Sequence, residues 1–146
     1  MYVSARSDYA VRAMLAVAAQ QPELAKAAAL ATAQDIPLSF LQGILLDLRR
    51  AGLLHSHRGV EGGYALARPA ASITIGDVLR AVSGSLTTVR GLPADVATYH
   101  GVATGLREVW LAVHAAISDV LDRTSLADLL APAQSRRTEA STSSTT

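Results

Sequence analysis

Apolar residues recur every three or four positions in several stretches of this chain, a pattern typical of helices with one buried face. The pattern predicts helices over residues 6–19, 24–34 and 38–51, with Pro37 at the start of the third helix and Gly52 beyond its end. Three helices joined by short polar turns form a helix-turn-helix unit, so we expect a mostly α-helical fold.

A different pattern follows the third predicted helix. Residues 53–56 and 64–66 have the composition of short strands and flank a glycine-rich segment, which predicts an antiparallel hairpin over about residues 53–67. Its loop carries Arg58 beside glycine. A helix followed by a hairpin with a basic tip is typical of a winged helix-turn-helix, which places the helix in the DNA major groove and the hairpin beside it.

The remainder of the chain is again helical in pattern. The segment Thr74–Asp77 resembles a capping box and predicts a helix to about Val82, and a long helix is expected over residues 98–123. A shorter helix should follow the polar segment Thr124–Asp128. The long helix carries an apolar seam that suits pairing with a second subunit. The predicted interface residues are Val102, Leu106, Val109, Trp110, Val113, Ile117 and Val120.

These patterns predict four regions along the chain. They are a winged helix-turn-helix unit over residues 1–83, a loop over 84–97, the dimerisation and closing helices over 98–131, and a disordered tail over 132–146. No apolar run comes close to the length of about 20 residues that a membrane-spanning helix needs. We therefore expect a cytoplasmic protein without a membrane partner.

Composition narrows the possible chemistry. The chain contains no cysteine, which excludes disulfides, thiol catalysis and thiolate-bound zinc or iron–sulfur sites. Its formal net charge is only +1, although the first 68 residues carry seven Lys/Arg against five Asp/Glu. The glycines of RGVEGGY lie in the predicted hairpin and form no dinucleotide-binding motif. No catalytic spacing is present, so we do not expect an enzyme.

The third helix and the hairpin supply the candidate DNA contacts. Ser39 and Gln42 lie near the helix start, where glutamine can pair with adenine, and Phe40 can touch a thymine methyl group. Arg58 can enter a minor groove or bind phosphates. The alternative is an ordinary solvated helix face beside a hairpin that binds nothing. The complete predicted set is Ser39, Phe40, Gln42, Arg49, Arg50, His57, Arg58, Gly59, Gly62 and Gly63.

Several segments together carry a family resemblance: SDYAVRAMLAVAA, IPLSFLQGILLDLRRAGLL, SHRGVEGGYALARP, SITIGDVLRAVSG and TSLADL. On these segments, and above all on the motif S-x-R-G-x-x-G-G-Y followed by L-A-R-P, the chain resembles the Rrf2 family of bacterial transcription regulators. The resemblance implies a homodimeric winged helix that binds an inverted-repeat operator, usually as a repressor. It also implies DNA contacts at Ser39, Phe40, Gln42 and Arg58.

One departure from the family pattern changes the expected regulation. Sensory members of the family hold an iron–sulfur cluster on three cysteines between the fourth helix and the long helix. Here that region reads LTTVRGLPADVATYHGVATGLREVW, without a thiol. Asp8 and Arg107 match positions where such members sometimes recruit further ligands. We therefore expect a regulator without a cluster and without another cofactor.

The source of regulation stays open at this point. His100 and His114 are fourteen residues apart, so helix periodicity does not guarantee that they meet. They can approach and bind a metal across a dimer interface, but ordinary polar roles are favoured for both. The apolar loop Leu86–Val96, within the wider region up to His100, can line a small-molecule pocket. Control through a protein partner is the other alternative.

Overall fold

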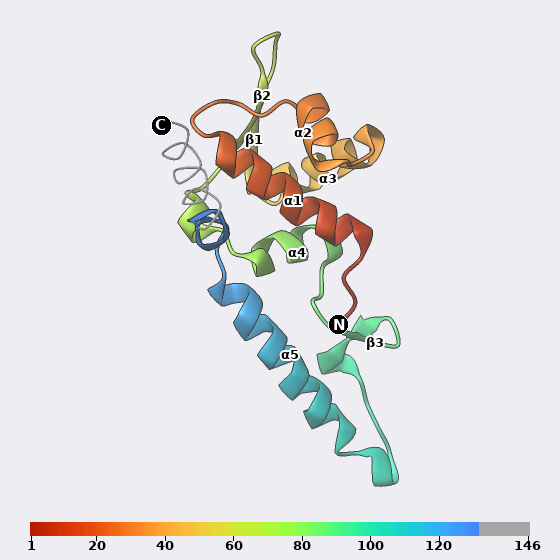
Figure 1. Cartoon of the computed structure of the whole chain (residues 1–146). Coiled ribbons are helices and arrows are strands. Elements are labelled where there is room, and N and C mark those ends of the chain that lie inside the picture. Colours follow the sequence, from red (N-terminus) through yellow and green to blue (C-terminus); the bar gives the residue numbers. More distant parts are fainter. Residues whose placement is uncertain (132–146) are drawn as a thin grey trace, which may run out of the picture.

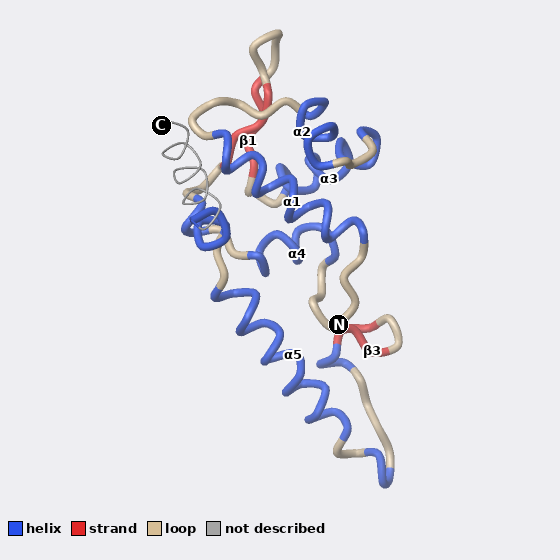
Figure 2. The backbone as a smooth tube through the Cα atoms, in the orientation of Figure 1, coloured by secondary structure: helices blue, strands red, loops and turns tan. Residues whose placement is uncertain are grey.

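The computed structural model describes residues 1–131, in which a helical body carries a projecting hairpin at one end and a long outlying helix at the other (Figure 1). Helices dominate and the strands are short, as the apolar periodicity predicted (Figure 2). The principal elements are α1 (Ala5–Gln20), α2 (Ala27–Gln34), α3 (Leu38–Arg50), β1 (Leu54–His57), β2 (Gly63–Leu66), α4 (Ile75–Ser83) and α5 (Leu106–Arg123). Residues 126–131 are also helical, and the tail predicted to be disordered, 132–146, lies outside the described residues.

The hydrophobic core lies where α1, α3 and α4 pack together. Met14 of α1, Leu45 of α3 and Val78 of α4 have no exposed surface. Leu126 from the closing helical segment is equally buried. Burying these side chains stabilises the body by about 25 cal/mol for each Å² of apolar surface removed from water.

The helix-turn-helix is formed by a sharp turn between α2 and α3. Asp35 adopts a left-handed conformation with φ of 53°, and Pro37 caps the start of α3. The two helices consequently meet at a bend of 118°. Within residues 1–131, no single helix is long and apolar enough to cross a membrane. The bent pair of α2 and α3 reaches that combined length and apolar composition, and no more than that.

The predicted second helix is wrong over its first three residues. It was expected from residue 24, but α2 begins at Ala27 because the preceding backbone is extended and pairs with the wing. Ala25 N–H donates to the Tyr64 carbonyl at 2.9 Å, and Tyr64 N–H donates to the Ala25 carbonyl at 2.7 Å. Two long-range hydrogen bonds thus override the helix preference of alanine.

The predicted long helix is wrong over its first eight residues. It was expected from residue 98, but α5 begins at Leu106 because Gly101 has a φ of +58° and starts only a short 3-10 turn, Gly101–Ala103. Val102 therefore lies outside the helix on which the seam was predicted. The loop before it contains a small hairpin of β3 (Thr88–Val89) and β4 (Leu92–Pro93).

Helix α5 is attached to the body at its C-terminal end. Ile75 N–H donates to the Thr124 carbonyl and Leu126 N–H donates to the Ile73 carbonyl, both at 2.9 Å. The Arg80 guanidinium donates two hydrogen bonds of 2.7 Å to the Asp122 carboxylate. Within residues 1–131, no residue of α5 is buried.

The Arg80–Asp122 pair makes a testable contribution to acid stability. The hydrogen bonds from Arg80 lower the pKa of Asp122, so the pair stabilises the fold above the usual carboxyl range and loses this effect as pH falls through the lowered pKa. Both side chains are about two-fifths exposed, with 40% and 42% of their surface accessible. We expect Asp122→Asn to lower the free energy of unfolding by roughly 0.2–1 kcal/mol at pH 7, and by less in acid.

Urea unfolding at neutral and acidic pH measures this contribution. Asp119→Asn is the matched control, because among the described residues Asp119 pairs with Arg123 of the same helix at 2.8 Å and with no residue of α4. An equal loss of stability in both variants would show that the link between α4 and α5 contributes nothing beyond a surface charge.

Candidate nucleic-acid interface

Helix α3 has one buried and one exposed face. Leu41, Ile44, Leu45 and Leu48 are in the core, whereas positions 42 and 43 are exposed and positions 46 and 47 are half-buried. The exposed positions 39, 42 and 49 fall on one stripe along the helix, because their spacing of three and seven residues matches the helical turn. The exposed residues are Leu38, Ser39, Phe40, Gln42, Gly43, Arg49 and Arg50.

Phe40 is the largest apolar side chain on this face. It is 61% exposed at the first turn of α3, where the core does not cover it. A single exposed aromatic ring needs no special explanation by itself. Beside Ser39 and Gln42, however, it adds an apolar contact group to the polar end of the stripe.

The other end of the stripe meets the wing, which is the hairpin of β1 and β2 with its connecting loop. Arg49 Nη1 donates to Ser56 Oγ of β1 at 3.2 Å. On the opposite side of α3, Asp47 pairs with Arg6 of α1. Helix α3 is therefore held between the body and the wing, and its exposed stripe continues onto the wing through Arg49.

The wing projects beyond the helices (Figure 1), and two glycines shape its tip. Gly59 has a φ of +107°, a conformation in which other residues are strained. A Cβ atom on Gly62 would lie 2.2 Å from the His57 carbonyl oxygen, so only glycine fits there. The side chain of Arg58 remains exposed beside this tight turn.

The base of the wing is held by residues that precede α2. A Cβ atom on Gly63 would lie 2.8 Å from the Ala25 carbonyl oxygen, so glycine permits the approach of this segment. Lys26 Nζ then donates to the Val60 carbonyl in the wing loop at 2.7 Å. Sequence analysis missed Lys26, because no local pattern marks a lysine 34 residues from its partner.

A shallow hollow of about 350 Å³ lies between the wing, the end of α3 and the start of α2. The hollow brings six of the predicted residues together with Lys26. Ser39, Phe40 and Gln42 lie at the other end of α3. Arg50 is exposed and does not line the hollow. Among the described residues, no acidic side chain lines this hollow. The lining residues are Lys26, Ala27, Arg49, Ser56, His57, Arg58, Gly59, Gly62, Gly63 and Tyr64.

The chemistry of the hollow suits an anion with several oxygen atoms. Lys26, Arg49 and Arg58 supply positive charge, and the glycines leave backbone groups accessible. Phosphate groups of a nucleic-acid backbone have this chemistry. Arg68 does not join the group, because it lies 3.5 Å from Asp77 at the start of α4.

The predicted seam residues other than Val102 lie on one face of α5. Val109 is 50% exposed, Val113 38% and Val120 64%, and Leu106 is 41% exposed. Trp110 and Ile117 are half-buried. No other element of residues 1–131 covers this apolar face.

Three comparisons place the chain among known proteins. A family model named Rrf2, described as an iron-dependent transcriptional regulator, matches residues 3–132. An HTH-type transcriptional regulator of Mycobacterium tuberculosis (strain H37Rv) is 47% identical over 130 residues, which are 88% of this chain and 81% of that relative. CymR of Bacillus subtilis is 30% identical over 130 residues, 88% of this chain and 89% of the relative.

Solved structures agree with these sequence matches. CymR, the global cysteine regulator of B. subtilis, superposes with a TM-score of 0.75 at 29% identity, covering 88% of this chain and 95% of that chain. IscR of T. potens superposes with a TM-score of 0.74 at 33% identity, covering 91% and 88%. The fold is therefore that of these winged-helix regulators.

The donor groups of this chain do not fit an iron–sulfur cluster, although the family description names iron. Such clusters rest on thiolates, and the chain has no cysteine. Within residues 1–131, no group of three His, Asp or Glu side chains is placed to hold a metal ion. Asp8 pairs instead with Arg12 at 3.5 Å, and His114 lies 3.4 Å from Ser118.

Proposed function

The chain belongs to the Rrf2 family of transcriptional regulators, and from this premise we propose that it is a homodimeric, cluster-free repressor of an inverted-repeat operator. One observation carries the proposal. The exposed stripe of α3 continues through the Arg49–Ser56 contact into the positively charged hollow and the wing. A helix face and a basic hairpin joined in this way match a DNA duplex, with its major groove and flanking phosphates.

Helix α3 enters the major groove in this proposal. Ser39 and Gln42 read base edges, with Gln42 placed to form two hydrogen bonds to an adenine. The exposed ring of Phe40 contacts a thymine methyl group. These contacts provide sequence selectivity.

The wing and the hollow bind the DNA backbone. Arg49 and Arg50 neutralise phosphates beside the major groove, and His57 with the backbone of Gly59, Gly62 and Gly63 lines the path of the strand. Arg58 at the tip enters the adjoining minor groove. Lys26 positions the wing loop through Val60 and adds charge to the hollow. Such contacts set affinity and its dependence on salt.

A second copy of this chain covers the apolar face of α5. The face repeats at helical spacing from Leu106 to Val120, and the opposite face carries Glu108 and Asp119. An apolar stripe of this length left in water is unfavourable, and a two-fold axis buries the same stripe from both subunits. The symmetry implies two half-sites about one helical turn apart, or slightly more.

Replacing Arg58 with alanine tests the role of the wing. We expect Arg58→Ala to weaken binding to an operator, first selected from genomic DNA, by ~1–3 kcal/mol at fixed salt. Fluorescence anisotropy with labelled operator measures the change. Arg123→Ala is the matched control, because Arg123 is exposed on α5 and pairs with Asp119. If Arg58→Ala and Arg123→Ala bind with equal affinity, the wing does not contact DNA.

The absence of a cluster is tested separately. Protein purified without oxygen should show no visible absorbance of an iron–sulfur chromophore and no stoichiometric iron, because no thiolate is available in the chain. Absorption spectra and metal analysis of the same sample measure both. Stoichiometric iron that is lost together with operator binding would contradict the proposal.

A further inference from the structure

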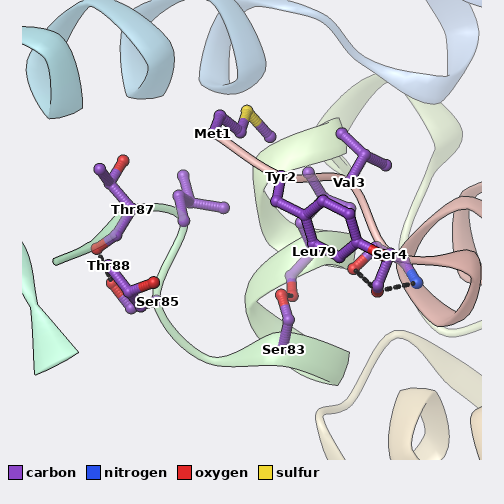
Figure 3. A pocket seen from close by; sticks show the side chains of 11 residues that line it. Met1, Tyr2, Val3, Ser4, Leu79, Ser83, Ser85, Thr87 and Thr88 are labelled. Atoms are coloured by element: carbon purple, nitrogen blue, oxygen red, sulfur yellow. Dashed lines mark hydrogen bonds between the residues drawn. The ribbon is translucent and has the colours of Figure 1, made fainter. Parts of the chain in front are cut away.

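A second pocket lies on the body away from the proposed DNA surface. It has a volume of about 480 Å³ and is formed by the segment before α1, the C-terminal end of α4 and the residues that lead into β3 (Figure 3). Pockets of this volume suit small molecules. The lining residues are Met1, Tyr2, Val3, Ser4, Ser7, Leu79, Ser83, Ser85, Leu86, Thr87 and Thr88.

The lining chemistry favours an uncharged ligand. Seven of these residues carry a hydroxyl group and four are apolar, and among the described residues no charged side chain lines the pocket. Apart from the α-ammonium group of Met1, the lining residues offer a charged ligand no opposite charge in return for the hydration that it would lose, which is costly. A compound with several hydroxyl groups and some apolar surface matches the lining.

One buried hydroxyl group in the pocket, that of Thr87, lacks a partner among the described residues. Ser83 Oγ donates to the Leu79 carbonyl at 2.6 Å, and Ser85 Oγ donates to the Thr87 carbonyl at 2.9 Å. Thr87 itself is only 8% exposed, and its Oγ1 has no hydrogen-bond partner within residues 1–131. Leaving a buried hydroxyl unpaired is unfavourable, and a ligand that bonds to it removes that cost.

The pocket is connected to the proposed recognition helix. Ser4 and Ser7 of the pocket wall flank Arg6, whose guanidinium pairs with Asp47 of α3. Ser4 also caps α1 by accepting a hydrogen bond from Ser7 N–H at 3.1 Å. A ligand that fixes this turn against α4 therefore acts on the helix that is directly attached to α3.

We propose that this pocket binds an uncharged, polyhydroxylated small molecule of monosaccharide to nucleoside size, and that its occupancy changes affinity for the operator. The effect on operator affinity rests on the proposed function, whereas the binding of the small molecule does not. The Thr87 hydroxyl donates or accepts one hydrogen bond to the ligand, while Leu79 and Leu86 contact its apolar part.

Matched pairs of neutral and charged compounds test the ligand class. Titrating the isotope-labelled full chain with D-ribose, D-glucose and adenosine should shift the amide signals of Ser4, Leu86 and Thr87 in a saturable manner. Ribose 5-phosphate, D-glucuronate and adenosine monophosphate should not, because each keeps the sugar ring of its neutral partner and adds negative charge. Failure of all three neutral compounds, or equal binding of the charged ones, would overturn the proposal.

An isosteric variant tests the unpaired hydroxyl. Thr87→Val keeps the side-chain shape and removes the hydroxyl group. It should weaken binding of the neutral ligand by about tenfold. The melting temperature of the ligand-free protein should stay equal or rise. Thr98→Val, at an exposed threonine outside the pocket, is the control. Wild-type affinity in Thr87→Val would overturn the assignment of this site.

Operator binding with and without the ligand tests the coupling. We expect the bound compound to change operator affinity, and Arg6→Gln to reduce that change while leaving binding of the compound itself intact. Ligand binding without any effect on the operator would overturn the coupling. Loss of operator binding under all conditions, with ligand binding intact, would instead contradict the proposed function.

Discussion

Replacing Val109 and Val113 together with glutamate is expected to separate the two subunits and to abolish tight operator binding. The two valines lie one turn apart on α5 and are 50% and 38% exposed in a single subunit. Burying two carboxylates from each copy in an apolar interface without partners costs far more than the interface gains. A monomer loses the second half-site, so operator affinity should fall by at least about 100-fold.

Sedimentation and circular dichroism distinguish dissociation from unfolding. The monomer should keep its helical signal, because neither valine belongs to the core of one subunit. The control is Ala112→Glu with Ala115→Glu, which places the same charge on the exposed face that carries Glu108 and Asp119. A double valine variant that sediments as a dimer would refute the α5 interface.

Replacing Gly43 with leucine is expected to make the protein more stable and its operator binding weaker. Gly43 lies inside α3, and a Cβ atom at this position would meet nothing within 4 Å. A helix-forming residue there should raise the free energy of unfolding by roughly 0.5–1 kcal/mol. The same side chain occupies the exposed stripe next to Gln42, so operator affinity should fall by ~1–3 kcal/mol or more.

Stability and operator affinity should change in opposite directions in this variant. Urea unfolding measures the stability and anisotropy measures operator affinity, and Gly43→Ala should show the same stabilisation with a smaller loss of binding. Ala115→Leu is the control for adding an exposed leucine away from α3. Unchanged operator affinity in Gly43→Leu would mean that this face of α3 does not enter the groove.

Local sequence patterns were sufficient for elements whose stabilising contacts are close in the chain. The start of α4 was predicted because Thr74 and Asp77 cap each other, with hydrogen bonds of 3.0 Å in both directions. The core face of α3 was predicted because Leu41 and Leu48 follow the helical repeat. The wing was predicted because glycines at fixed positions around Arg58 permit its turn.

Other features depend on contacts between distant segments, which a local pattern does not contain. Residues 24–26 have helical composition, but Ala25 pairs with Tyr64. The Lys26–Val60 contact spans 34 residues and depends on that pairing. The pocket joins Ser4 to Thr87, whereas the sequence offered only the loop from Leu86 onward.

The attachment of α5 has a consequence for the operator. Helix α5 joins the body through the Thr74–Ser125 backbone bridge and the two hydrogen bonds between Arg80 and Asp122. In the dimer that we propose, this joint sets the angle between each DNA-binding surface and the two-fold axis. Under this proposal, the joint determines the number of base pairs between half-sites, while α3 determines which bases are preferred. Spacer length and base preference can therefore evolve independently in relatives that share the same recognition helix.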